Sequence, residues 1–566
     1  MALRLVIGRS GTGKTHLCFK EVEEKLINEP DGAPLIYIVP DQMTFHTEYA
    51  FATLPNLSGM TRLNVYSFSR FSLRVLERMG GVTRTHLTTA GLAMMLRKII
   101  ENRKSELKVF KKAADQRGFY TLLQQTISEF KRYCHTPDDI ARRQKQLAED
   151  GREDEAILID KLHDLYLIYN DFEKALLGKY VDSDDYLNLA ASKIPMWDEL
   201  KNAEVYIDGF DSFTPQEFTV IAALLQTVKR VTVTLTLDRI YEGRTPNDLT
   251  LFRTTAKACV KLLNLVEEEG ILCEEPVICE GNRKLKFEGL RALEKNFEKR
   301  PYVIGPVDGS VKIVEAVNRR EEIEACAREI LQLVRDEGYR YRDLAVLTRD
   351  LSGYRELVET IFVDYGIPLF IDQKRVMHHH PLIELIRSSL DAIVQNWRYE
   401  AVFRAFKTDL FYPLGDDIQK WREDVDLLEN YVLAFGIHGQ HWRTNDAWIY
   451  REYRGLDERD VPQSKQEKAK QKELNRIRMS LSDPLLQLEQ KIKRARTVRD
   501  QAFELYRFLE GLNIPEKMER LRDQAEKEGR LDEAREHDQV WKAVIDLLDQ
   551  LVEAAGRERM SLEQFT

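Results

Sequence analysis

The chain has 566 residues, too many for a single hydrophobic core, so its length predicts at least two domains. Charged residues make up 32% and the net charge is −9, which excludes a polycation that binds nucleic acid over its whole surface. No apolar run reaches the roughly eighteen residues of a membrane span, so we expect no membrane association. The N-terminus leads directly into a glycine-rich motif without room for a signal peptide, which predicts a cytoplasmic protein.

Two compositional features have structural interpretations. The six cysteines include no C-x-x-C pair, as expected for reduced thiols in a cytosolic protein. Residues 97–147 hold thirteen Lys and Arg against six Asp and Glu. That stretch is either a local nucleic-acid surface or a solvated helical face, and charge alone favours the solvated face.

The first part of the chain alternates apolar runs with amphipathic stretches. We predict strands at residues 3–7, 35–39, 63–67, 204–208 and 231–237, with a helix over residues 15–26 after the first strand. Continuous apolar strands separated by helices are typical of a parallel α/β sheet. Residues 85–200 have mostly helical periodicity, which predicts a helical insertion within this α/β domain.

The pattern restarts after a linker at residues 295–308. Strands are predicted at 311–316, 344–347 and 368–371, with a helix over 321–334, which indicates a second α/β unit. Beyond residue 381 only helices are predicted, and the sequence stops at the start of one, as expected for a piece of a longer protein. The predicted units are residues 1–84 plus 201–295, 85–200, 309–380 and 381–566.

A phosphate-binding motif follows the first predicted strand and opens the first helix. It matches G-x-x-x-x-G-K-[ST] in full and consists of Gly8, Arg9, Ser10, Gly11, Thr12, Gly13, Lys14 and Thr15. Glycines let backbone N–H groups converge on phosphate oxygens, and the helix N-terminus favours negative charge. We therefore expect ATP to bind here, with Lys14 on the β- and γ-phosphates and the Thr15 hydroxyl on Mg²⁺.

An ATP hydrolase also needs acidic residues after a later strand, one for Mg²⁺ and one to activate water. Asp208 ends the predicted strand 204–208 in the right place for the metal, although an ordinary loop acid is the alternative. Gly209 occupies the position of the base. The sequence therefore predicts a site that binds ATP and hydrolyses it poorly, and we assign no catalytic residue.

Several short motifs, in this order and spacing, carry a family resemblance. They are the phosphate loop, Ile38-Val-Pro-Asp-Gln-Met-Thr-Phe45, Val65-Tyr-Ser-Phe-Ser-Arg70, Ile207-Asp-Gly-Phe210, Phe213-Thr-Pro-Gln-Glu217, Asn396-Trp-Arg-Tyr-Glu-Ala-Val-Phe403 and Leu428-Glu-Asn-Tyr431. Together they resemble the AddB subunits of bacterial AddAB helicase–nucleases, in their bacillus-like form, along essentially the whole chain.

This resemblance implies a superfamily 1 helicase-like fold with two parallel-sheet P-loop-type domains and inserted helical domains. The four predicted units would be 1A-like, 1B-like, an incomplete 2A-like and a truncated 2B-like domain. It implies a heterodimer with an AddA-type helicase–nuclease subunit that resects DNA double-strand ends for recombinational repair. The AddB subunits of such complexes scan single-stranded DNA for the Chi hotspot without driving translocation. Their nuclease and [4Fe–4S] cluster belong to a C-terminal half beyond these residues.

The DNA-contacting residues implied by the resemblance follow predicted strands. They are Gln42, Thr44, Phe68, Arg70 and Phe210. Aromatic side chains stack on bases and amides read base edges, so this set could hold and discriminate a strand. On sequence alone, Phe68 and Phe210 could equally be core residues. Leu73 stands where bacillus-type relatives can carry an aromatic, which removes one stacking contact.

Two features of the second half have weaker interpretations. Arg349 ends the predicted strand 344–347, where superfamily 1 proteins place an arginine that faces the nucleotide across the cleft; a surface role is the simpler alternative. The three histidines 378–380 have no carboxylate or cysteine at ligand spacing, so we interpret them as structural.

Two other functions remain as alternatives. A self-sufficient P-loop motor would hydrolyse ATP to translocate along DNA, which Gly209 disfavours. A small-molecule kinase would need a compact domain with a lid, which the long helical insertion disfavours.

Overall fold

The computed structural model describes the chain except residues 56–58, 82–84, 115, 117, 150–154, 178, 182–184, 283–284, 372–376, 416, 445 and 453–461. Its first unit is a parallel sheet with the order β3-β2-β6-β7-β1-β8, in which β9 also pairs with β1. The strands are β1 (Ala2–Gly8), β2 (Leu35–Ile38), β3 (Leu63–Tyr66), β6 (Glu204–Ile207), β7 (Arg230–Thr236), β8 (Leu272–Cys273) and β9 (Val277–Ile278). All five strands predicted for this region are therefore confirmed.

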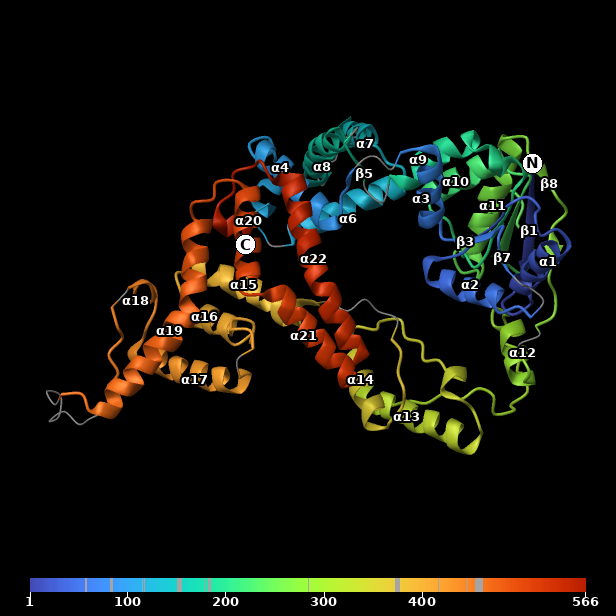
Figure 1. Ribbon diagram of the computed structural model, residues 1–566. Coiled ribbons are helices and arrows are strands. Elements are labelled where there is room, and N and C mark those ends of the chain that lie inside the picture. The colour runs from blue at the N-terminus through green and yellow to red at the C-terminus, as the bar shows by residue number, and fades with distance from the viewer. Residues whose placement is uncertain are drawn as a thin grey trace.

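Helices cover both faces of this sheet (Figure 1). They are α1 (Lys14–Asn28), α2 (Thr44–Ala52), α3 (Phe68–Met79), α9 (Tyr186–Lys193), α10 (Pro215–Leu225) and α11 (Arg253–Glu268), with the short 3-10 helix η1 (Asp41–Met43) before α2. One apolar core lies under α3, α9, α10 and α11, and a second lies under α1 and α2. Because every strand is parallel, the loops after β1, β2, β3 and β6 meet at the same edge of the sheet.

A helical unit is inserted between α3 and β6 and has an apolar core of its own. Its main helices are α4 (Thr89–Arg103), α6 (Phe119–Arg132), α7 (Pro137–Glu149) and α8 (Ala156–Leu176), with the short α5 (Phe110–Ala113). The two-residue strands β4 (Thr85–His86) and β5 (Tyr180–Val181) pair where the chain enters and leaves this unit. Helix α9, which lies within the predicted insertion 85–200, packs on α3 and α10 and contributes to the core of the sheet unit.

The region 309–380 differs from the sequence prediction. It contains α13 (Arg319–Asp336) and α14 (Arg355–Asp364), preceded by α12 (Glu288–Asn296), but the predicted strands 311–316, 344–347 and 368–371 are wrong. Within the described residues these segments have no strand beside them, and a β-strand forms only with a hydrogen-bonding neighbour. Ile313, Leu347 and Phe370 are each about nine-tenths exposed. Segments 344–348 and 367–371 line a groove of about 880 Å³ against α13 and α14.

The rest of the chain is helical and shares a large core. The helices are α15 (Pro381–Val394), α16 (Tyr399–Phe406), α17 (Ile418–Phe435), α18 (Gln440–Arg443), α19 (Lys465–Ile492), α20 (Val498–Gly511), α21 (Ile514–Lys527), α22 (Leu531–Ala555) and α23 (Leu562–Phe565). His380 is buried and structural, as predicted, because its Nδ1 accepts the N–H of Leu382 at the start of α15. In the described part of the chain, no helix is long and apolar enough to cross a membrane.

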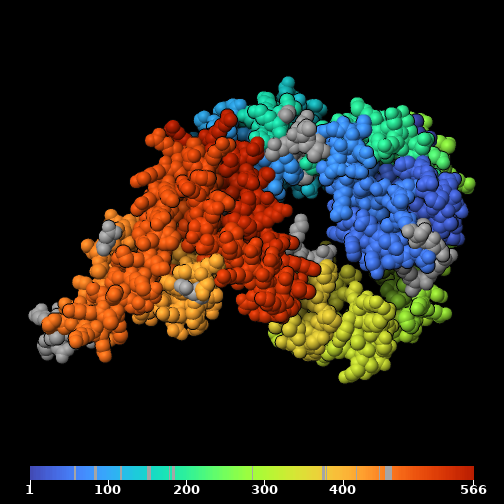
Figure 2. Space-filling model, in the orientation of Figure 1, coloured from blue at the N-terminus to red at the C-terminus, as the bar shows by residue number. Residues whose placement is uncertain are grey.

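The two helical units touch each other. Gln550 on α22 accepts the Thr88 N–H at 2.8 Å and donates to the His86 carbonyl at 3.1 Å, and Lys98 pairs with Glu558 at 2.8 Å. With α13 and α14 below, the units surround an opening near the middle of the molecule (Figure 2). Helices α2 and α3 form the edge of the sheet unit nearest that opening in this view (Figures 1 and 2).

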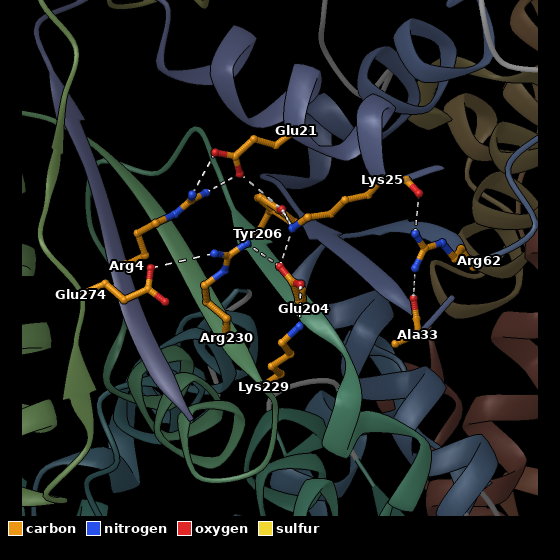
Figure 3. A network of polar contacts seen from close by, with 10 residues as sticks. All are labelled: Arg4, Glu21, Lys25, Ala33, Arg62, Glu204, Tyr206, Lys229, Arg230 and Glu274. Atoms are coloured by element: carbon orange, nitrogen blue, oxygen red, sulfur yellow. Dashed lines mark hydrogen bonds and ion pairs between the residues drawn. The ribbon is translucent and has the colours of Figure 1, made fainter. Parts of the chain in front are cut away.

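A polar network holds the amino-terminal edge of the sheet, opposite the edge where the loops after β1, β2, β3 and β6 meet (Figure 3). Glu204 pairs with Lys25 at 2.5 Å and with Arg230 at 2.6 Å, while Arg4 binds Glu21 through both of its terminal nitrogens. Burial disfavours ionisation of Glu204, but the hydrogen bonds from Lys25 and the charge of Arg230 outweigh it and keep the pKa of Glu204 below its usual value. These contacts join β1, β6, β7 and α1.

Candidate nucleotide and DNA site

The phosphate loop forms the turn between β1 and α1 that the motif predicts. Gly11 and Gly13 have φ angles of 80° and 98°, a left-handed conformation that favours glycine. Lys14 Nζ donates to the carbonyls of Gly8 at 2.7 Å and Arg9 at 3.0 Å. Burial lowers the pKa of Lys14, although the nearby Asp208 opposes that shift. The lysine ammonium is therefore held inside the loop, within reach of an anion bound there.

Residues far along the chain brace this loop from outside. Asn282 donates from Nδ2 to the Ser10 carbonyl at 2.7 Å. The Arg9 guanidinium forms an ion pair with Glu294, donates to the Glu294 carbonyl at 2.6 Å, and lies 5.0 Å from the centre of the Phe252 ring. Helix α12 and the segment before it therefore fix the outer wall of the phosphate loop.

Asp208 lies at the carboxyl end of β6, close enough to Lys14 to influence its pKa. Its side chain is 5% exposed, and both oxygens accept hydroxyl hydrogen bonds, Oδ2 from Tyr37 at 2.9 Å and Oδ1 from Thr234. A carboxylate has about four lone-pair sites, so these two bonds leave acceptor capacity for a cation or its water. Thr15 is exposed in the first turn of α1. The residues present thus fit Mg²⁺ held with a nucleotide.

Gly209 adopts a backbone conformation that other residues resist. Its φ angle is 84°, and a Cβ atom built there would lie 3.4 Å from Pro40 Cδ. An L-residue in the left-handed region costs roughly 1–2 kcal/mol. The turn after Asp208 is therefore shaped for glycine, and a carboxylate base at this position would be strained.

Arg349 lies in the second unit, on the exposed stretch between residue 347 and α14. Within the described part of the chain, it makes no hydrogen bond or ion pair with the phosphate loop. Its predicted role at the nucleotide site remains a prediction.

The five predicted DNA-contacting residues gather where β2, β3 and β6 end, because these strands are neighbours in the sheet. Gln42 on η1 and Arg70 on α3 are exposed, and Phe210 is half-buried. Ser67 caps α3 by accepting the Arg70 N–H, which orients the first turn of that helix. These three side chains are accessible to a ligand.

Thr44 and Phe68 are buried instead. Thr44 is 5% exposed and donates to the Asp41 carbonyl at 2.9 Å. Phe68 is 4% exposed, and its ring centre lies 5.3 Å from that of Phe210 and 6.2 Å from that of Phe213. Both side chains are therefore largely enclosed, and Phe68 packs against Phe210. Their contact with DNA remains a prediction.

Comparison with known families identifies the chain. The family model described as ADDB, N-terminal, matches residues 5–294. The chain belongs to the AddB family. The matched range contains the phosphate loop and the three accessible residues Gln42, Arg70 and Phe210.

Individual relatives match the sequence of this chain along its entire length. The B subunit of the ATP-dependent helicase/deoxyribonuclease of Geobacillus kaustophilus (strain HTA426) is 48% identical over the whole chain, which covers 49% of that relative. The corresponding proteins of Geobacillus thermodenitrificans (strain NG80-2) and Bacillus cereus (strain AH187) are 47% and 45% identical, with 49% and 48% of their lengths covered. The chain therefore spans about half the length of the curated relatives it matches.

Sequence reasoning missed the residues that brace the AddB phosphate loop. Glu294 stands 285 positions from Arg9, and Asn282 stands 272 positions from Ser10. Neither Asn282 nor Glu294 belongs to a recognisable motif. They reach the loop because β9, which precedes them in the chain, pairs with β1. The hydroxyl donors of Asp208, Tyr37 and Thr234, could have been expected from their polar positions within buried strands.

Proposed function

We propose that the chain is the N-terminal, helicase-like part of the AddB subunit of a heterodimeric ATP-dependent helicase–nuclease that resects DNA double-strand breaks. In this role it binds ATP with Mg²⁺ and scans single-stranded DNA for the Chi hotspot, without acting as the motor. The observation that carries the proposal is a complete phosphate loop beside a turn in which glycine stands at the position of the base, on the same sheet edge as Gln42, Arg70 and Phe210.

The nucleotide would be held by the loop and by two side chains. A bound ATP supplies phosphate oxygens that attract the loop N–H groups and the helix N-terminus. Lys14 would transfer its hydrogen bonds from the Gly8 and Arg9 carbonyls to those oxygens, and Thr15 and Asp208 would hold Mg²⁺. Hydrolysis would be slow because Gly209 places no base near the attacking water.

The strand would lie across the accessible residues of the sheet edge. The Gln42 amide could pair with a base edge, Phe210 could stack on a base, and Arg70 could bind a phosphate or a base. These three side chains come from the ends of adjacent strands and the first turn of α3, so they could contact neighbouring nucleotides of one strand.

The proposed architecture is that of a superfamily 1 helicase. Residues 1–84 plus 201–295 would form the 1A-like domain, 85–200 the 1B-like insertion, 309–380 an incomplete 2A-like domain and 381–566 a 2B-like helical region. The exposed apolar side chains of Ile313, Leu347 and Phe370 support an incomplete unit, since such side chains are normally covered. The partner would be an AddA-type protein, and a [4Fe–4S] cluster would belong to the rest of the AddB subunit.

The test uses the intact heterodimer with linear DNA that carries or lacks the hotspot. Gln42→Ala and Arg70→Ala should erase hotspot-dependent protection of the strand while unwinding continues. Arg74→Ala is the matched control, because Arg74 lies one turn further along α3 and pairs with Glu77 at 3.2 Å. If Gln42→Ala and Arg70→Ala still protect the hotspot strand as the wild type does, this surface does not read DNA.

A further inference from the structure

Helix α2 buries two threonines and exposes two large aromatic side chains, which is unusual for a surface helix. Thr44 and Thr47 are 5% and 6% exposed, whereas Phe45 and Tyr49 are 73% and 60% exposed. Surface helices normally bury their apolar side and present polar residues to water. Two large aromatic side chains directed into solvent, over buried threonines, are therefore a feature that packing of this helix does not explain.

The inner side of α2 is already complete without these aromatics. Phe51 is fully buried, stacks on Phe19 with ring centres 4.0 Å apart, and meets Tyr37 edge-on at 5.4 Å. This packing fixes α2 against the sheet core that also holds the Asp208 partner Tyr37. The outward aromatics consequently stand on a rigid support.

Phe45 and Tyr49 lie four residues apart, so they are neighbours along one side of the helix. Their ring centres are 6.2 Å apart and their planes differ by 24°. Met43, 47% exposed, lies just before them on η1, next to Gln42. The pair therefore continues the surface that begins with Gln42 at the end of β2.

We propose that Phe45 and Tyr49 form a stacking platform for bases of single-stranded DNA, extending the surface of Gln42, Arg70 and Phe210. The inference rests on the proposed function and adds two base-contacting residues to it. Flat aromatic rings stack on any base, so the platform would hold the strand without reading its sequence, while Gln42 beside it reads a base edge.

The small number of large apolar side chains exposed on η1 and α2 favours a nucleic acid over a protein. A stable protein interface buries about 800 Å² on each partner, whereas only Met43, Phe45 and Tyr49 form this apolar patch among the described residues of η1 and α2. Bases need just such small, flat contacts, spaced along a strand. Helix α2 lies at the edge of the sheet unit nearest the central opening (Figures 1 and 2).

The test measures binding of the 566-residue chain to a fluorescent oligothymidylate by anisotropy, at several salt concentrations. Phe45→Ala and Tyr49→Ala should each weaken binding about 5- to 150-fold, which corresponds to the loss of one base stack of about 1–3 kcal/mol. The salt dependence should stay unchanged, because no phosphate contact is lost. Phe45→Trp should restore binding and Phe45→Leu should not, since stacking needs a ring. Phe503→Ala, at a 54% exposed ring on α20, is the control and should bind as the wild type.

The outcomes separate the platform from the wider proposal. Wild-type affinity in Phe45→Ala together with weakened binding in Arg70→Ala would overturn the platform and leave the proposed function standing. Absence of binding by the wild-type chain would overturn both. Full rescue by Phe45→Leu, or loss of association with the AddA-type partner at unchanged DNA affinity, would assign the patch to protein contact and overturn the inference.

Discussion

Replacing Gly209 tests whether the backbone itself keeps a base out of the nucleotide site. At a φ angle of 84°, an alanine Cβ would lie 3.4 Å from Pro40 Cδ, an ordinary contact, so the substitution adds strain and no clash. The strain should cost about 1–2 kcal/mol, a factor of about 5–30 in the local opening equilibrium. Gly209→Ala should therefore speed hydrogen exchange of the β2 and β6 amides by that factor.

Gly209→Glu carries the same strain and adds the carboxylate that a hydrolase would need. We expect exchange as fast as in Gly209→Ala and ATP hydrolysis that stays at background with or without DNA, because the strained turn does not hold a base in place. Gly511→Ala is the control, since Gly511 lies in α20 with open space around it. The reasoning is refuted if Gly209→Glu keeps wild-type exchange and gains DNA-stimulated hydrolysis.

Three further predictions concern the loop, the sheet and the C-terminal helices. Lys14→Ala should abolish ATP binding measured by calorimetry, since it removes the ammonium that faces the phosphates; unchanged affinity would contradict the assignment. Glu204→Gln should destabilise the sheet by on the order of 3 kcal/mol, because Lys25 and its other cationic partners lose their carboxylate. The pKa of Glu204 is lowered in the folded state, so its contribution to stability is present above about pH 4.3 and is lost as the pH falls through the folded-state pKa. If the stability of Glu204→Gln depends on acid pH as that of the wild type does, this is refuted. Burial, and then the His537 ring nitrogen 2.9 Å from His380 Nε2, lower the pKa of His380 to about 4. The C-terminal helices should therefore lose stability as the pH falls from about 6.5 toward 4. A melting temperature that does not change over this pH range would contradict the prediction.

The sequence predicted the parts of the fold whose signals are local. The apolar runs of the first sheet pair within the chain, and the phosphate loop is one contiguous motif, so both were recognised. The runs at 311–316, 344–347 and 368–371 are also rich in apolar residues, but composition cannot show whether a neighbouring strand is present to pair with them.

The site was predicted less completely for a related reason. Position after a strand places a residue at the sheet edge, but it does not determine whether the side chain points inward. Phe68 and Thr44 turn into the protein, while Phe45, one residue after Thr44, turns outward to 73% exposure. The contact of Arg9 with Glu294 depends on the path of the chain across 285 residues, which no local pattern encodes.

The measurement that tests the central claim most directly is ATP binding and turnover by the purified chain, with and without single-stranded DNA. We predict Mg²⁺-dependent ATP binding that Lys14→Ala abolishes, with hydrolysis at background under both conditions. Failure of the wild-type chain to bind ATP would contradict the nucleotide site. Robust DNA-stimulated hydrolysis would contradict the proposed role and show that the chain is itself a motor.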